Sequence, residues 1–180
     1  MIITRKKVLG KLAIVILNTG QRGKILREDD FTIIYNKNDE IISINISNFK
    51  KYFSAKEGAH TFTEEQMIFL KKTFDLEILE KSKFLVGEIL EIKNHPKSEK
   101  LFIISVEANK KYSIVTNVSS LEVGNKIVFA KVGATLPSGV EILSSKILEI
   151  ESEGMVCMPQ TLDLEKYDLN KFSKGDYFIF

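Results

Sequence analysis

Two short segments in the second half of the chain constrain its fold more than any other feature. The first, VGEILEIKNHPKSEKL from Val86 to Leu101, predicts a strand, a turn around residues 94–96 and the start of a second strand. The second, ESEGMVC from Glu151 to Cys157, places Gly154 where the backbone can turn or approach a neighbour closely before an apolar strand. We interpret the two segments as parts of one small β-barrel.

The remainder of the second half supplies further strand signals. Strands are predicted at Phe84–Ile92, Leu101–Glu107, Lys111–Thr116, Lys126–Val132 and Ile147–Cys157, with a last extended piece at Tyr177–Phe180. Five short strands with irregularly spaced turns are typical of the five-stranded Greek-key barrel called the OB-fold. We therefore expect residues 84–180 to form this barrel.

The first half shows a different pattern. Short β-branched runs at Leu12–Leu17, Phe31–Tyr35 and Ile41–Ile46 predict a small β-meander, with the segment Asn18–Asp30 as a polar separator. The sequence TEEQ from Thr63 has the spacing of a helix capping box and predicts one helix. We therefore expect residues 1–80 to form an α+β domain of unknown role, joined to the barrel by a short charged connection at 81–83, and we expect the whole chain to be mainly β.

Charge is divided unevenly between the two halves. Residues 1–83 contain 15 Lys or Arg against 11 Asp or Glu, whereas residues 84–180 contain 11 Lys against 13 acids. The net charges are therefore +4 and −2, and seven basic residues precede the first acid, Glu28. Arg22, Lys24 and Arg27 in this group are candidate phosphate contacts, although charge runs are often only solvated surface.

Cysteine content and hydropathy restrict the cellular compartment in which we expect this protein. The single cysteine, Cys157, excludes an internal disulfide and is interpreted as a small buried residue rather than a reactive thiol. No stretch approaches the roughly 18 apolar residues of a membrane helix. The basic and apolar start of the chain is too short and lacks a cleavage site for a secretory signal, so we expect a cytoplasmic protein.

The barrel motifs resemble those of the EMAP-type tRNA-binding family, which also occurs within the β subunit of bacterial phenylalanyl-tRNA synthetase. Family members read V-G-x-[IV] followed by H-P-x-A-D-K-L, and here Ser98 and Glu99 replace the Ala and Asp. The segment VGATLPSG at Val132–Gly139 is similar to the family's V-G-A-x-L-P-x-G turn. The resemblance covers Phe84 to about Leu164, and the first domain more weakly resembles the N-terminal extension of YtpR-type proteins.

The resemblance implies a tRNA-binding protein, and it directs attention to particular residues. His95, Lys97 and Lys100 lie in the loop between the first two barrel strands, where they could contact RNA, although His95 could equally cap the turn. Ser152, Gly154 and Met155 match the family's S-x-G-M and could line an RNA-contacting edge or simply shape the barrel end. Asn117 lies where IVTNVSSL departs from the family pattern.

The barrel also contains aromatic residues that could stack on bases. Phe102, Tyr112 and Phe129 are the candidates, although most are expected in the core; Tyr112 is the first choice for an exposed ring.

Catalytic and cofactor signals are absent from the sequence. His60 and His95 have no metal-ligand spacing to each other or to Cys157, and no phosphate-binding glycine loop or nucleophile elbow occurs. We therefore expect no enzyme activity, no cofactor and no metal. The alternative to RNA binding is a module that docks an aminoacyl-tRNA synthetase or a second copy of the chain; a detached synthetase fragment would lack any means of binding ATP.

Overall fold

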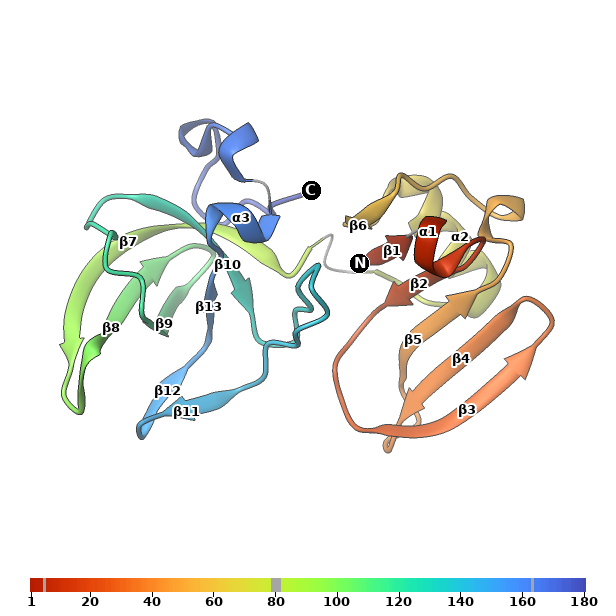
Figure 1. Ribbon diagram of the computed structural model, residues 1–180, viewed down its shortest axis with the longest axis horizontal. Coiled ribbons are helices and arrows are strands. Elements are labelled where there is room, and N and C mark those ends of the chain that lie inside the picture. Colours follow the sequence, from red (N-terminus) through yellow and green to blue (C-terminus); the bar gives the residue numbers. More distant parts are fainter. Residues whose placement is uncertain (5, 79–81, 163) are drawn as a thin grey trace. The chain divides into compact units, whose positions relative to one another are not determined.

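The chain forms two compact units. The computed structural model describes residues 1–4, 6–78, 82–162 and 164–180. The first unit comprises Met1–Ser82 together with Ile179–Phe180, and the second comprises Lys83–Phe178 (Figure 1). The charged connection predicted at 81–83 begins outside the described residues.

A six-stranded antiparallel sheet forms the first unit, in the order β3-β4-β5-β2-β1-β6. Its strands are β1 (Ile2–Thr4), β2 (Ala13–Ile16), β3 (Arg22–Glu28), β4 (Phe31–Asn36), β5 (Ile41–Ile46) and β6 (Gly58–His60). Side chains alternate between faces along each strand, so Val15, Ile33 and Ile44 direct their side chains into one core. The three predicted strands of the meander coincide with β2, β4 and β5 to within one residue.

Helical segments accompany this sheet. They are α1 (Lys6–Leu9), the 3-10 turn η1 (Phe49–Lys51) and α2 (Glu64–Phe74). The predicted capping box is confirmed, because the Thr63 side chain accepts from the Gln66 N–H and the Gln66 side chain accepts from the Thr63 N–H. Leu70 on α2 is fully buried in the core.

The prediction that Asn18–Asp30 is only a polar separator is wrong. This segment contains β3, an edge strand that pairs with β4 from Arg22 to Glu28 and has mostly exposed side chains. An edge strand with little burial shows no apolar alternation, so the sequence pattern missed it. The β3–β4 turn is tight, with Asp29 at a φ of 45°.

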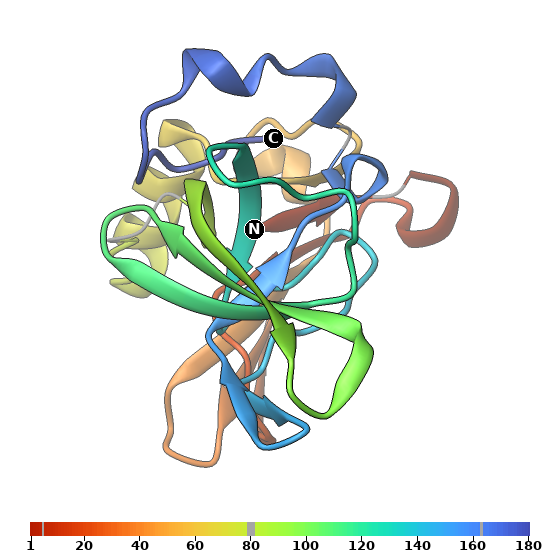
Figure 2. The same ribbon diagram turned by 90° about the vertical axis from the view of Figure 1, so that its left-hand side faces the viewer.

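The second unit is a closed antiparallel barrel. Its five-stranded sheet has the order β13-β10-β7-β8-β9, and β11 pairs with β12 in a separate hairpin. The strands are β7 (Phe84–His95), β8 (Ser98–Glu107), β9 (Lys111–Thr116), β10 (Lys126–Lys131), β11 (Ser145–Ile147), β12 (Ile150–Ser152) and β13 (Gly154–Val156). The strands curve around one another (Figure 2). The core that they enclose contains Ile89, Ile104, Ile114 and Phe129. The predicted mainly β fold with an OB-like barrel is confirmed.

Short helical turns follow the barrel strands, in a segment for which the sequence predicted no element. They are α3 (Pro159–Leu162), η2 (Leu164–Lys166) and η3 (Leu169–Lys171). The single strand predicted at Ile147–Cys157 is instead interrupted, because the chain first forms the β11–β12 hairpin and then β13. The extended piece predicted at Tyr177–Phe180 retains only one bridge, between Leu85 and Tyr177. No helix within the described residues is long and apolar enough to cross a membrane.

Candidate nucleic-acid interface

Ser152 joins the two ends of the barrel sheet. Its hydroxyl accepts a hydrogen bond from the Val115 N–H at 3.0 Å and donates to the Gly154 carbonyl at 2.9 Å. Beside it, the Glu153 N–H donates to the Ser113 carbonyl, and the Ser113 N–H donates back to the Glu153 carboxylate. Ser152 is only 3% exposed. Its position therefore assigns the hydroxyl to barrel closure, rather than to an RNA-facing edge.

Gly154 allows β13 to lie close to β10. A Cβ atom at this position would be 2.5 Å from the Ala130 carbonyl oxygen, closer than atoms can approach. Close backbone approach, one of the two roles expected for this glycine, is thus the one observed. Met155, the next residue, is half-buried. Ser152 and Gly154 of the S-x-G-M motif therefore both help to close the barrel.

His95 connects the β7–β8 turn to the β11–β12 hairpin. Its Nδ1 atom accepts from the Lys97 N–H at 3.1 Å, so the ring proton lies on Nε2, which donates to the Ile147 carbonyl at 3.2 Å. The ring is buried. The structure therefore places His95 as a cap of the turn, the structural alternative raised by the sequence, and its side chain is not available for stacking.

Lys97 reinforces the same connection from the solvent side. Its ammonium group pairs with the Glu149 carboxylate at the tip of the β11–β12 hairpin, and the two side chains are 52% and 78% exposed. An exposed pair of this kind is worth only about 0–1 kcal/mol. Both loops lie at the same end of the barrel in the two views (Figures 1 and 2). In an OB-fold these two connections are the usual nucleic-acid contact loops.

The hairpin tip has an unusual backbone. Leu148 and Glu149 form the two-residue turn between the paired residues Ile147 and Ile150, and both have positive φ, 45° and 75°. Hairpins with this geometry usually use Asn-Gly because non-glycine residues at positive φ cost about 1–2 kcal/mol each. Leu148 is 48% exposed. Strained, exposed residues of this kind are concentrated at binding sites.

Three further residues predicted to contact RNA or bases lie at this end, namely Lys100, Asn117 and Phe102. Lys100 and Asn117 are exposed and Phe102 is half-buried. Phe102 is paired in register with Asn94 on β7 and Thr116 on β9, which brings it next to the residue preceding Asn117. A polar hollow of about 510 Å³ lies along the turn, lined by residues 94–99.

The prediction that Tyr112 is exposed is wrong. The side chain is 6% exposed, its ring lies 4.8 Å from that of Phe129, and its hydroxyl donates to Asn109. The Lys110 ammonium lies over the ring at 4.7 Å from its centroid. Residues two apart in a strand face the same side, so Tyr112 lies on the core side of β9 with Ile114, although its hydroxyl is polar. Phe102 is a half-buried aromatic residue whose strand register places it beside the candidate interface.

Arg22, Lys24 and Arg27 lie together on one strand, although in the other unit. All three are exposed on the edge strand β3, and the Lys24 ammonium is 5.5 Å from the centre of the Tyr35 ring. Gly23 between them is required by packing, because a Cβ there would be 2.6 Å from the Asn36 carbonyl oxygen. The basic segment is thus a fixed strand, rather than a loose arm.

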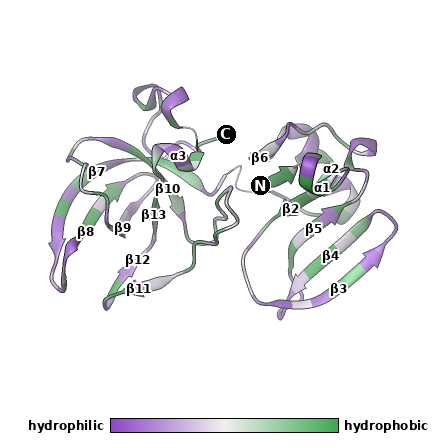
Figure 3. Ribbon diagram, in the orientation of Figure 1, coloured by the Kyte–Doolittle hydropathy of each residue, from purple (hydrophilic) through white to green (hydrophobic). Residues whose placement is uncertain are grey.

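Charges at the barrel end are balanced. The exposed charged residues of the β7–β8 turn region and the hairpin are Lys93, Lys97, Lys100, Lys146, Glu91, Glu99, Glu149 and Glu151. The outer turns are hydrophilic and the strands carry most of the hydrophobic residues (Figure 3). Phosphate attraction at this end is therefore modest and depends on which lysines are paired.

The single cysteine of the chain, Cys157, is buried and directly follows β13. Burial raises the pKa of the Cys157 thiol to about 12, which keeps it protonated and unreactive. Among the described residues, no group of three or more His, Cys, Asp or Glu side chains could hold a metal ion.

An OB-like barrel with two connected loops at one end is an architecture used by oligonucleotide-binding and oligosaccharide-binding domains. Residues 84–175 match the family model described as "Putative tRNA binding domain". The chain belongs to this tRNA-binding-domain family.

The similarity to one relative extends beyond the barrel. The "Putative tRNA-binding protein YtpR" of Bacillus subtilis is 30% identical over 161 residues, which cover 83% of this chain and 80% of that protein. The phenylalanine–tRNA ligase beta subunit of Halalkalibacterium halodurans is 35% identical over 96 residues, 52% of this chain but only 12% of the subunit. A solved structure, a MetRS related protein from Pyrococcus horikoshii, superposes with a TM-score of 0.35 at 22% identity, over 49% of this chain and 83% of that one.

Proposed function

We propose that this chain binds folded tRNA with the end of the barrel formed by the β7–β8 turn and the β11–β12 hairpin, and that binding involves no chemical step. The observation that carries the proposal is the family match over residues 84–175, which falls on the barrel unit. The connection of the two loops through His95 supports it, since a fixed pair of loops is a surface prepared for a rigid partner.

The side chains at this end suit recognition of shape and backbone. Lys97 and Lys100 can contact phosphates, Asn117 can hydrogen-bond to phosphate or sugar, and Phe102 offers a partly exposed ring. Ser152 and Gly154 contribute indirectly, because they hold the strands in position. Met155 is the half-buried residue that follows Gly154 in β13. A surface with few unpaired charges implies moderate affinity that depends on fit.

A salt titration of tRNA binding tests this proposal. The double variant K97A/K100A should weaken binding to all tRNA species alike and reduce the salt slope by about one unit for each lysine–phosphate interaction that it removes. The matched control is K166A/K171A, which removes the same charge from the exposed lysines of η2 and η3. Equal effects of the two double variants would contradict the proposed surface.

A second candidate function is docking of a protein partner, either a synthetase or a second copy of the chain. Exposed apolar side chains along the β10–β13 connection favour it: Val140 is 53% exposed and Leu143 is 57% exposed. Docking through such residues would be insensitive to salt, whereas tRNA binding should weaken steeply. The variant V140S/L143S separates the two, because only docking depends on these side chains.

The absence of a chemical step is also open to test. The buried histidines and the protonated Cys157 support a purely binding role, with no cofactor required. Turnover of ATP or of aminoacyl-tRNA by the purified protein would contradict it. Because the proposed partner is tRNA, the protein is expected in the cytoplasm.

A further inference from the structure

Leu148 is an apolar residue whose position the fold itself does not explain. It lies at the tip of the β11–β12 hairpin, is 48% exposed and has a φ of 45°. A single exposed leucine is common on protein surfaces, but a leucine held at positive φ carries a backbone cost that Asn or Gly would avoid. A contact outside the chain would account for an apolar side chain in this place.

The hairpin holds Leu148 in a fixed position. On one side of it, the Ile147 carbonyl accepts a hydrogen bond from the His95 ring at 3.2 Å. On the other side, the Glu149 carboxylate pairs with the Lys97 ammonium group. Both neighbours of Leu148 are therefore tied to the β7–β8 turn, and a residue that is held in place before binding costs less to order in a complex.

The chemistry of leucine restricts what Leu148 can contact in a folded RNA. Its side chain has no donor, acceptor or charge, so it gains only from covering apolar surface. In a paired RNA helix the base faces are covered by stacking, and the grooves display hydroxyl groups and phosphates. Loops, in contrast, expose the faces of unpaired bases. A loop base is therefore the part of a folded RNA that matches this side chain.

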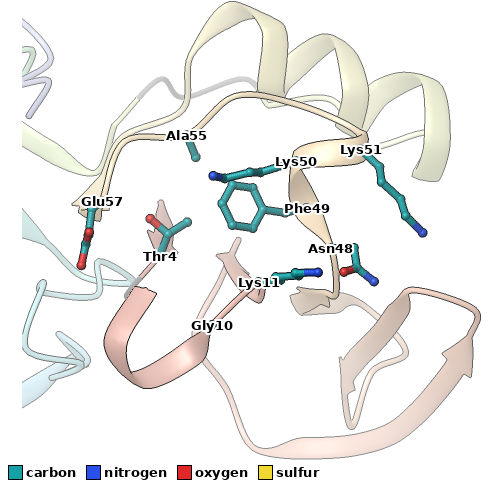
Figure 4. A pocket seen from close by; sticks show the side chains of 9 residues that line it. All are labelled: Thr4, Gly10, Lys11, Asn48, Phe49, Lys50, Lys51, Ala55 and Glu57. Atoms are coloured by element: carbon teal, nitrogen blue, oxygen red, sulfur yellow. The ribbon is translucent and has the colours of Figure 1, made fainter.

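A cavity in the first unit offers no such contact for a base. It has a volume of about 890 Å³ and lies beside η1. The Phe49 ring on its wall is only 5% exposed and belongs to the core of that unit. The ammonium groups of Lys11 and Lys50 point in opposite directions (Figure 4). We therefore place the base contact at the barrel end, and not in this cavity.

We propose that Leu148 packs against the face of an unpaired loop base of tRNA, while Lys97 and Lys100 contact phosphates. This inference rests on the proposed function, and it adds a base contact to a surface that otherwise recognises shape and backbone. Leucine and similar apolar side chains pack against bases in several DNA-binding proteins. Because an apolar contact releases no counterions, its contribution to affinity does not depend on salt.

Binding of labelled tRNA by the full chain carrying Leu148→Asn tests the proposal. Affinity should fall by about threefold to tenfold, as expected when part of a leucine side chain is no longer buried, and the salt slope should stay unchanged. Asn tolerates positive φ, so the melting temperature should not fall, which distinguishes this result from a loss of folding. Leu148→Met keeps an apolar side chain and should retain the affinity. The control is Leu143→Asn, at a 57% exposed residue of the β10–β11 connection, which should also retain it.

Two synthetic RNA stem-loops test whether the group that Leu148 contacts is a base. One has ordinary loop nucleotides, and in the other the same loop nucleotides lack their bases, so that both carry the same phosphates. The unchanged chain should bind the intact stem-loop more tightly, and Leu148→Asn should bind the two equally. Equal binding of the two stem-loops by the unchanged chain, including no binding to either, would overturn the assignment to a loop base.

The remaining outcomes separate this inference from the proposed function. If K97A/K100A weakens tRNA binding and Leu148→Asn does not, the RNA-binding surface stands and the role of Leu148 is wrong. The role of Leu148 is also wrong if Leu143→Asn causes the same loss, or if the loss in Leu148→Asn comes with a lower melting temperature. If the unchanged chain does not bind tRNA, the proposed function and this inference both fail.

Discussion

At the scale of single residues, the Glu149 carboxylate pairs with the ammonium group of Lys97, which the proposed function assigns to an RNA phosphate. Both side chains are largely exposed. Replacing Glu149 by Gln removes this competitor for Lys97. Because an exposed pair is worth up to about 1 kcal/mol, tRNA affinity should rise by up to about fivefold, with a steeper salt dependence.

The control for this prediction is Glu151→Gln, which removes the same charge from the same hairpin at an exposed residue. Both variants are compared with the unchanged chain by fluorescence anisotropy with labelled tRNA. Equal gains from the two would show that only net charge matters and that Lys97 is not masked.

Ser152 is predicted to act through stability. The variant Ser152→Ala leaves the buried Val115 N–H without its acceptor, which costs about 1–3 kcal/mol. Ser145→Ala, at an exposed position of β11, should change the free energy of unfolding by no more than about 0.5 kcal/mol. Urea denaturation followed by circular dichroism measures both, and a small effect at Ser152 would contradict its role in closing the barrel.

His60 should make stability depend on pH. Its ring is buried, Nδ1 donates to the Thr61 carbonyl at 2.8 Å, and Nε2 has no partner among the described residues. Burial lowers the His60 pKa below its ordinary value of 6.5, with smaller contributions from Lys56 and the N-terminus, against the opposing hydrogen bond to Thr61. The unfolded chain therefore binds a proton that the folded chain does not, and stability falls as pH drops below 6.5.

The corresponding measurement is the free energy of unfolding at about pH 7.5 and about pH 5.5, a window above the range where carboxyl groups titrate, near 4. The variant His60→Gln should flatten this dependence, whatever its effect on absolute stability. An unchanged slope in the variant would assign the pH dependence to other groups.

At the scale of elements, the strand β3 allows a direct test of whether the first unit contacts tRNA phosphates. It holds Arg22, Lys24 and Arg27 in an exposed edge strand, so their charges have fixed spacing. The triple Ala variant should reduce the salt slope of tRNA binding if the strand contacts phosphates. The control removes three exposed lysines elsewhere in the unit, Lys7, Lys56 and Lys72. A smaller or equal reduction in the β3 variant would leave the strand as solvated surface.

Which elements could be predicted depended on how strongly burial shaped their sequence. Helix α2 was predictable because its capping box is a local signal, and β9 was predicted with its observed bounds because its core-facing residues alternate. The β3 strand was missed because its side chains are mostly exposed, and the β11–β12 hairpin was missed because its strands are short and largely exposed. The hairpin turn also uses Leu148 and Glu149 at positive φ, residues that give no turn signal.

The candidate site followed the same division. The loop at residues 94–100 was found from its motif, but the partners that fix it, Ile147 and Glu149, are 52 residues away in sequence and only the folded chain brings them together. Ser152 was recognised as part of a motif, whereas its hydrogen bond to Val115 required the closed barrel.

At the scale of the whole molecule, we expect the two halves of the chain to contribute unequally to the electrostatic part of RNA binding, because their net charges differ. The barrel half carries a net charge of −2 and the first half +4, so a barrel alone has little long-range attraction for phosphate. The separated piece Lys83–Phe178, which has its own core and excludes Ile179–Phe180, should therefore bind tRNA more weakly than the full chain and with a smaller salt slope. Both are measured at the same ionic strength, after circular dichroism has shown that the piece is folded. If the triple variant of β3 in the full chain shows the same loss of affinity and salt slope as the piece, the missing phosphate interactions belong to that strand. If the piece binds with the affinity and salt slope of the full chain, the first unit has no part in holding tRNA.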